Sequence, residues 1–211
     1  MTTERYLFGY NIEMIKFTNP SLEIPFIKLR EKYDLAIDKN QRNIEAICIT
    51  SFSKTSNEVN ARYVNLKNID NKDLIFFSNY NSPKSKEFSE HSQITALIYW
   101  NTTNTQIRLK AFIKKTSSKF NKAYFVNRSE QKNALAISSN QSEPIDSFEN
   151  VTENYNKSLK FDNLKECPDY WGGYSFTPYY FEFWEGHESR LNKRDKYEMQ
   201  DGHWDHSILQ P

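Results

Sequence analysis

Hydrophobic and polar positions alternate along much of the middle of the chain, a pattern that predicts β-strands. The clearest case is Thr105–Lys115, where every second residue from Ile107 to Ile113 is apolar and the residues between them are mostly polar. The other predicted strands cover residues 44–52, 61–68, 73–79, 93–100, 174–184, 194–199 and 204–209. Because short turns separate most of them, an antiparallel sheet is expected.

A different spacing, three and four residues apart, predicts helices between the strands. The first predicted helix follows residues 19–21 and places on one face Leu22, Phe26, Leu29, Tyr33 and Ile37. A short second helix is expected from Ser82-Pro83, because proline is favoured at the first helical position. Two more are expected at 117–137 and 145–161, on either side of a polar break at 138–144.

These elements together predict a mainly β fold, with an antiparallel sheet closed into a barrel and helices on its outside. Residues 1–18 have no clear period and are expected to form a loosely held N-terminal arm, followed by one domain at 19–211. The strand at 174–184 carries a dense run of aromatic residues. This is more apolar mass than an edge strand needs, and it favours an interface with a second subunit.

Composition narrows the possible classes of protein. The chain has 211 residues, enough for one hydrophobic core, and a formal net charge of +1, which disfavours a nucleic-acid-binding role. It contains five glycines and none of the glycine-rich motifs of dinucleotide-binding, P-loop or α/β-hydrolase proteins. Without a membrane-length apolar run or a signal-peptide pattern, we expect a soluble cytoplasmic protein that does not bind membranes.

The cysteines and histidines suggest no metal site. Cys48 and Cys167 are too few for a disulfide framework and fit a reducing compartment. Cys48 lies within an apolar strand and is expected to be an inert core thiol. His203 and His206 are three apart, so they would point to opposite faces of a strand.

Several cations could bind an anion. Arg62 and Lys67 lie on one predicted strand, but they would point to opposite faces unless a bulge or an elongated ligand lets both serve one site. Ser78, Ser82 and Lys84 surround a helix N-terminus, where free N–H groups favour anions. The alternatives are an exposed strand with solvated ends and an ordinary helix cap with a surface lysine.

Two further polar segments could contact a ligand. Gln141-Ser142, in the break between helices, could hold the edge of a polar ring or simply form a capped loop. Arg190, Lys193 and Arg194 lie in one turn and could receive a phosphorylated or carboxylated ligand, or remain solvated.

In this order and spacing, the segments resemble the pyridoxamine 5′-phosphate oxidase family from about residue 20 to residue 211. The matching blocks are R-x-x-x-L-K at 62–67, F-F-S-N and S-x-K at 76–84, Gln106, Y-F-x-x-R at 124–128, Q-S at 141–142, W-G-G-Y at 171–174, E-F-W at 182–184 and R-L-x-x-R at 190–194. Several blocks in the right order are far more specific than any one of them.

The resemblance implies an FMN-binding split β-barrel that forms a homodimer with FMN between the subunits. It also implies oxidation of pyridoxamine or pyridoxine 5′-phosphate by dioxygen to pyridoxal 5′-phosphate, with hydrogen peroxide and, from the amine, ammonia as further products. The implied cofactor-binding residues are Arg62, Lys67, Phe77, Ser78, Lys84, Gln106, Gln141, Ser142, Trp184 and Arg194. Among these, the FMN phosphate would be held by Arg62, Ser78 and Lys84. The implied substrate-binding residues are Lys67, Tyr124, Arg128, Lys132, Arg190 and Asn192, of which the last two would be catalytic.

Four departures from the family pattern concern the substrate. Pro83, Lys132 and Asn192 stand where the family usually has Arg, Ser and His, and residues 1–18 contain no R-R-E-Y-like element. The flavin oxidases of phenazine biosynthesis, which share the fold and the FMN site, are therefore an alternative. Segments that resemble this branch equally well are 99–106, 141–143 and 209–211. A flavin-binding protein without turnover is a further alternative.

Overall fold

The computed structural model describes residues 6–7, 10–11 and 14–211. One sheet contains β3 (Lys16–Thr18), β4 (Ala46–Ser53), β5 (Glu58–Asp70), β6 (Asp73–Asn79), β7 (Gln93–Trp100), β8 (Thr105–Lys115), β9 (Trp171–Glu185), β10 (Lys193–Gln200) and β11 (His203–Ile208). A separate pair is formed by β1 (Tyr6–Leu7) and β2 (Tyr10–Asn11). The helices are α1 (Ile24–Asp38), α2 (Pro83–Glu90), α3 (Ser118–Val126), α4 (Glu130–Ser138), α5 (Phe148–Phe161) and the 3₁₀ turn η1 (Asn101–Thr103).

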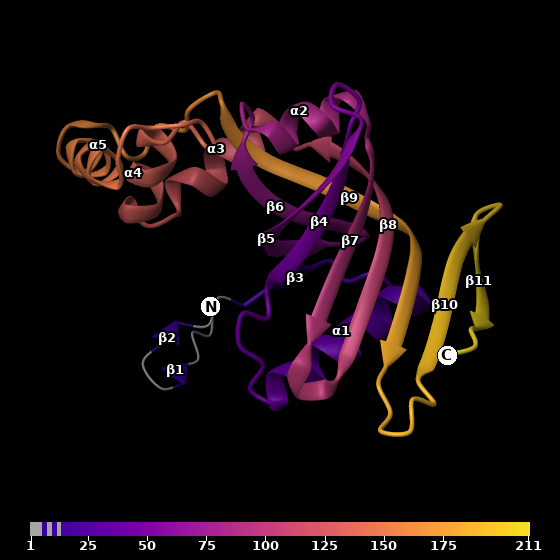
Figure 1. Ribbon diagram of the computed structural model, residues 1–211. Helices are drawn as coiled ribbons and strands as arrows, with labels where there is room; N and C mark the ends of the chain where they lie inside the picture. The colour runs from indigo at the N-terminus through magenta and orange to yellow at the C-terminus, as the bar shows by residue number, and fades with distance from the viewer. Residues whose placement is uncertain (1–5, 8–9, 12–13) are drawn as a thin grey trace.

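The sheet closes into a barrel. Its strand order is β11-β10-β9-β6-β5-β4-β7-β8, and β8 also pairs with β9, so the six strands from β9 to β8 form a closed ring (Figure 1). All pairings within this ring are antiparallel, and β3 adds a parallel pairing to β5. The prediction of a mainly β fold with an antiparallel barrel is confirmed.

Strand β9 changes its neighbour part-way along. Its first half pairs with β6 and its second half with β10, while β8 follows it along the other side. The change falls next to Pro178, which has no N–H to donate to a ladder, and next to Tyr179, which β8 skips in its register. This divergence of β6 and β10 splits the barrel.

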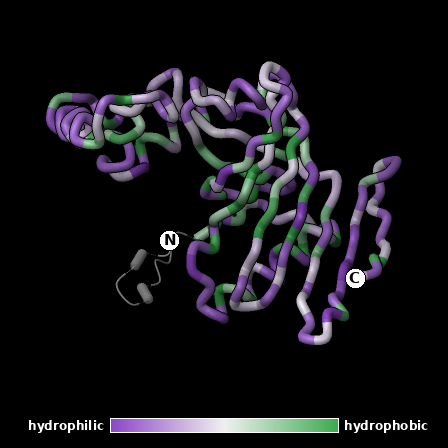
Figure 2. The backbone as a smooth tube through the Cα atoms, in the orientation of Figure 1, coloured by the Kyte–Doolittle hydropathy of each residue, from purple (hydrophilic) through white to green (hydrophobic). Residues whose placement is uncertain are grey.

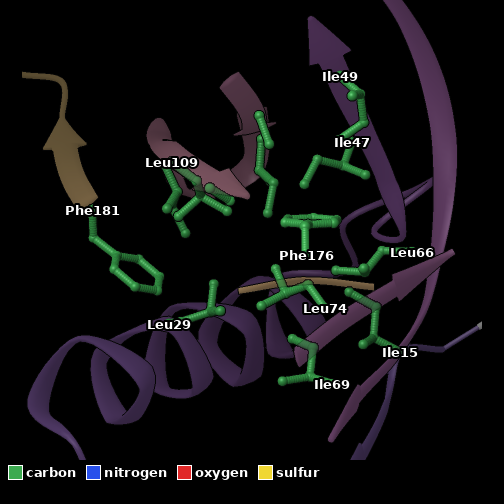
Figure 3. Packing of buried hydrophobic residues seen from close by; sticks show 14 of the residues in the cluster. Ile15, Leu29, Ile47, Ile49, Leu66, Ile69, Leu74, Leu109, Phe176 and Phe181 are labelled. Atoms are coloured by element: carbon green, nitrogen blue, oxygen red, sulfur yellow. The ribbon is translucent and has the colours of Figure 1, made fainter. Parts of the chain in front are cut away.

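The core lies inside the barrel and against α1. Ile107, Leu109 and Ala111 are fully buried, as the alternating pattern of β8 predicts. Figure 3 shows Leu29 of α1 pointing towards the barrel side chains. The barrel strands carry most of the hydrophobic positions, whereas the β10–β11 hairpin is largely hydrophilic (Figure 2).

Some side chains face the opposite way from the sequence prediction. Phe181 and Phe183 are fully buried in this chain's own core, so for these two residues the assignment to a subunit interface is wrong. Cys48 is only half-buried, because Ile47 and Ile49 take the inward positions of β4. The prediction of a core thiol there is therefore also wrong, and the cause is the strict alternation of side chains along a strand.

The boundaries of some elements also differ from the predictions. The helix expected at 117–137 is two helices, because Ser129 caps a new one: its Oγ accepts a hydrogen bond from the N–H of Lys132 at 3.4 Å. Lys16–Thr18, assigned from the sequence to the arm, forms β3, while residues 1–5, 8–9 and 12–13 of that arm lie outside the described residues. No helix within the described ranges has the length and apolar character needed to cross a membrane.

Candidate functional site

A group of polar side chains meets at the end of the barrel that α2 covers. Lys84, in the first turn of α2, donates to Gln141 Oε1 at 2.6 Å and to Ser82 Oγ at 2.9 Å. Ser78, at the end of β6, donates to the same Gln141 oxygen at 3.0 Å. We call Arg62, Ser78, Lys84 and Gln141 the α2 cluster. Gln141 is 63 residues from Ser78 and 57 from Lys84 in the chain, and the structure brings it into direct contact with both.

Arg62 joins the α2 cluster from inside the barrel. It lies opposite Ile49 on the inward face of β5 and donates to Ser51 Oγ and, at 2.9 Å, to Glu87 of α2. Glu87 is 6% exposed and also accepts a hydrogen bond from Asn60. A buried acid therefore balances one of the two cations.

The electrostatics of this cluster favour an anion. Burial and the charge of Arg62 together lower the pKa of Lys84 to about 8, against the opposing effect of Glu87. The N-terminus of α2 adds the positive end of its helix dipole, although the N–H groups of Ser85 and Lys86 already donate to the carbonyl of Ser82. Two close cations, a serine hydroxyl and a helix N-terminus form a donor set that fits a phosphate group.

A second group of cations lies beside a stack of aromatic rings. The ring of Phe77 stacks on Tyr124, with centroids 3.7 Å apart, and on Trp171 at 5.1 Å. Arg128 lies over Trp171, 4.6 Å from its centroid, and donates to Asn133 Oδ1 at 3.0 Å. We call Lys67, Tyr124 and Arg128 the Arg128 cluster.

Lys67 reaches this cluster through an irregularity in β5. The register between β5 and β6 shifts between Leu66 and Asn68, which leaves Lys67 as the extra residue of a bulge. Burial lowers the pKa of Lys67; the charge of Glu45 opposes this effect and the charge of Arg128 adds to it, so the two cations lie close enough to repel each other. Burial likewise lowers the pKa of Arg128 and raises that of Tyr124. The bulge sends Lys67 to this cluster, whereas Arg62 belongs to the α2 cluster.

Five of the remaining predicted residues gather at the opposite end of β9: Gln106, Trp184, Arg190, Asn192 and Arg194. Gln106 of β8 lies directly opposite Trp184, and Trp184 lies directly opposite Arg194 of β10. We call these three residues the Trp184 row. The turn that follows β9 carries Arg190, which is exposed and has a left-handed backbone with φ of 63°. Asn192, in the same turn, accepts a hydrogen bond from the N–H of His187 at 3.1 Å.

This end of β9 also has a surface hollow. A cavity of about 320 Å³ is lined by the turn residues Leu191 and Asn192, by Lys193 and Arg194 at the start of β10, and by 208–211. Two predicted ligand residues, Asn192 and Arg194, are therefore among the residues that line an accessible space.

Within one chain, the α2 cluster and the Trp184 row are far apart. Gly172 lies opposite Ser78 at one end of β9, and Trp184 lies about twelve residues further along. At roughly 3.3 Å per residue, a strand covers roughly 40 Å over that length. Figure 1 shows β9 running from the region of α2 and α3 to the side of β10. One chain by itself does not bring the α2 cluster and the Trp184 row together.

Two predicted residues occupy the surface. Ser142 is exposed and has φ of 71°, and Lys132 is exposed on α4. The sequence prediction also missed residues that hold the clusters in place. Glu87 binds Arg62, and Asn133, fully buried, binds Arg128 while donating to two backbone carbonyls. Nothing in the local pattern distinguishes these two from ordinary polar residues of a helix.

The fold and the site define a class of protein: a split β-barrel with two clusters of cations suited to phosphate groups. A family described as the pyridoxine 5′-phosphate oxidase C-terminal dimerisation region matches residues 171–211. The pyridoxine/pyridoxamine 5′-phosphate oxidase of Paraburkholderia phytofirmans is 36% identical over 154 residues, 72% of each chain. That of Christiangramia forsetii is 32% identical over 191 residues, 89% of this chain and 88% of the relative. The chain belongs to the pyridoxine/pyridoxamine 5′-phosphate oxidase family.

Solved structures show the same fold. The structure of PhzG from Burkholderia lata 383, in complex with tetrahydrophenazine-1-carboxylic acid, has a TM-score of 0.84 and 24% identity, and the match covers 92% of this chain and 95% of that one. A pyridoxamine 5′-phosphate oxidase-related, FMN-binding protein from Nostoc punctiforme has a TM-score of 0.74 and 14% identity, covering 86% and 97%. At these identities the similarity establishes the fold, and the split β-barrel prediction is confirmed.

Proposed function

We propose that this protein is an FMN-dependent oxidase that converts pyridoxamine or pyridoxine 5′-phosphate to pyridoxal 5′-phosphate, with dioxygen as the electron acceptor. The observation that carries the proposal is the presence of two distinct clusters, in each of which the cations are buried or half-buried. A flavin mononucleotide and a phosphorylated pyridine each carry one phosphate group, so two phosphate-binding clusters match the needs of this reaction.

The α2 cluster would hold the FMN phosphate. Arg62 and Lys84 would supply charge, and Ser78 would supply a hydroxyl donor, next to the N-terminus of α2. Gln141 accepts from both Ser78 and Lys84 in the structure, and it is exposed, so it can turn towards a ligand. The chemistry that FMN supplies when bound is acceptance of a hydride from the C4′ carbon of the substrate and delivery of the electrons to dioxygen, which leaves as hydrogen peroxide.

The Arg128 cluster would hold the substrate phosphate. Lys67 and Arg128 repel each other in the free protein, and a phosphate dianion between them would remove that cost. The ring stack on Phe77 and Trp171 keeps Tyr124 and Arg128 in fixed positions. These residues would therefore position the substrate and have no need to act as a strong base.

A second copy of the chain would complete each site. The Trp184 row and Arg190 lie at the far end of β9 from the α2 cluster, so a homodimer in which these ends meet would enclose FMN between the subunits. The outward barrel face that carries Trp184 also carries Tyr63 and Tyr99, which are 73% and 54% exposed. Large exposed apolar side chains of this kind are typical of surfaces that another protein covers.

A second candidate is an oxidase of the same kind that acts on a phenazine precursor. The observation that favours it is the altered substrate region: Asn192 is engaged with the backbone of His187, and Lys132 is an exposed lysine on α4. Both positions differ from the family pattern in residue type. The two clusters with a phosphate-type donor set favour the phosphorylated vitamer.

An anaerobic flavin spectrum tests the proposal. The protein loaded with FMN is expected to lose its long-wavelength absorbance on addition of pyridoxamine 5′-phosphate and to regain it in air. An Arg190→Ala variant is expected to keep the flavin and lose turnover, since Arg190 is a proposed substrate-binding residue, while Glu188→Ala, an exposed residue of the same turn, serves as its control. Bleaching by a dihydrophenazine acid and not by the vitamer would favour the second candidate, and failure to take up FMN would refute both.

A further inference from the structure

Glu182 is a buried carboxylate on the outward face of β9, with 3% of its surface exposed. Its neighbours in sequence, Phe181 and Phe183, point into the barrel core, so Glu182 points away from it. Arg108 of β8 lies directly opposite on one side, and its Nε donates to Oε2 at 3.1 Å. On the other side Arg194 of β10 donates to Oε1 through Nε at 2.9 Å and Nη2 at 2.8 Å. One carboxylate therefore holds two arginines from two strands.

Arg194 has a third anchor. Its Nη1 donates to the backbone carbonyl of Gln210 at 2.8 Å. An arginine side chain has five N–H donors in one plane, and these bonds use one each on Nε, Nη1 and Nη2. The plane of the guanidinium group is thus fixed by protein atoms, and two N–H donors stay available for a ligand. Trp184, the residue opposite Arg194, stands beside that fixed group.

We propose that Glu182 is a positioning residue that locks Arg194 beside Trp184 in the orientation needed to contact bound FMN. This inference rests on the proposed function, because it assigns Arg194 to the flavin site. Holding a long flexible side chain in its bound geometry beforehand removes the entropy that a ligand would otherwise have to overcome. This role also explains why an acid lies in the otherwise aromatic run at 179–184, directly before Phe183-Trp184.

The bond of Glu182 to Arg108 and its bonds to Arg194 can be tested separately. Burial alone would raise the pKa of Glu182, but hydrogen bonds from Arg108 and Arg194 outweigh it and keep that pKa below its usual value. When Arg108 is lost, Arg194 and the hydroxyl of Tyr180, which donates to Glu182 Oε2 at 3.1 Å, still bind the carboxylate. Substitution of Arg108 removes its bonds to Glu182 and leaves those between Arg194 and Glu182 in place. Substitution of Glu182 removes the carboxylate that holds Arg194.

The test measures FMN affinity by equilibrium fluorescence quenching and records the visible circular dichroism of the bound flavin. Glu182→Gln is expected to weaken FMN binding about tenfold and to change the flavin dichroism, because charge-assisted bonds to Arg194 are lost. Glu182→Asp, which keeps the charge, is expected to recover part of the affinity. Arg108→Met is expected to stay within about twofold of the wild type. In an Arg194→Gln background, Glu182→Gln is expected to add no further loss.

Asp195→Asn is the matched control. Asp195 is a carboxylate on the neighbouring strand, 4% exposed, that binds Lys28 and His206 on the other face of the sheet. Its loss is expected to lower the thermal midpoint and leave FMN affinity unchanged. If Glu182→Gln does not fold, the FMN affinity of Glu182→Asp is compared with that of the wild type and of Asp195→Asn instead.

Three results would overturn the inference. These are wild-type affinity in both Glu182 variants, equal losses in Arg108→Met and Glu182→Gln, and additive losses in the Arg194→Gln background. Each of them leaves FMN binding by the wild type intact, and so leaves the proposed function standing. Absence of FMN binding by the wild type would instead overturn the proposed function, and this inference with it.

Discussion

Lys84 and Lys67 are two lysines whose charge the fold makes costly. Burial lowers the pKa of both, and each has an arginine close by that lowers it further, Arg62 for Lys84 and Arg128 for Lys67. A buried cation that faces another cation gains most from a nearby anion. The ionisation of these residues is therefore expected to respond to phosphate binding.

FMN affinity should depend on pH through Lys84. In the free protein its pKa is about 8, and a bound phosphate dianion would raise it towards the ordinary lysine value. Because binding raises this pKa, the affinity that depends on the charged lysine is complete below about pH 8 and declines as pH rises above it. Fluorescence titrations between about pH 7 and pH 9, above the second ionisation of the phosphate near pH 6, would measure the decline.

Lys84→Gln should weaken FMN binding and remove this pH dependence over the same range. Lys86→Gln is the control, since Lys86 is on the same helix but exposed. An unchanged pH profile in Lys84→Gln would show that another group is responsible.

At the scale of elements, the start of β9 is packed too tightly for any side chain at Gly172. Asn121 Nδ2 donates to the hydroxyl of Tyr80 at 3.0 Å, and a Cβ on Gly172 would overlap both of these atoms. This contact ties α3 to β9 and to the loop after β6, the region that carries both the α2 cluster and the Arg128 cluster. The glycine is needed here for close approach between segments, with an ordinary negative backbone φ.

Gly172→Ala is expected to destabilise the protein by about 1–3 kcal/mol, the usual cost of overpacking a tight interior. Thermal and urea unfolding would measure it. Ser175→Ala on the same strand is the control: its buried Oγ has no hydrogen-bond partner among the described residues, so its removal should be neutral or stabilising. Equal losses of stability in both variants would contradict the role assigned to Gly172.

At the scale of the whole molecule, the two ends of β9 cannot serve one ligand within a single chain. The α2 cluster lies where β9 pairs with β6, and the Trp184 row lies where it pairs with β10. In a dimer with two-fold symmetry, the α2 cluster of each chain could face the Trp184 row of the other chain. The distribution of site residues along one strand thus leads to an expectation about assembly.

Mixing two variants, each defective in a different part of the site, should restore activity if the site is shared. A chain with Lys84→Ala and a chain with Arg190→Ala, unfolded and refolded together, would form mixed dimers in which one site has both wild-type halves. Random pairing then gives about a quarter of the wild-type activity. Refolding each variant alone is the control, and no recovery in the mixture would indicate that each site is built within one chain.

Much of the fold follows from local pattern. The alternation in β8 predicts both the strand and its buried face, and β6 and β7 have the predicted boundaries. The candidate site residues follow from the resemblance of several short blocks, in the right order, to a family. The supporting residues, such as Glu87 and Asn133, were not found, because their partners are distant in the chain and no local spacing reveals them.

The sequence by itself determined where strands and helices form and which residue types could bind phosphate, since these depend on periodicity and side-chain chemistry over a few residues. Only the tertiary structure decided which of those residues meet. The bulge at Lys67 redirects one cation, Gln141 reaches Ser78 across 63 residues of chain, and β9 divides its length between β6 and β10. Strand pairing and register depend on the packing of the whole core, so a site assembled from their ends is a property of the folded molecule.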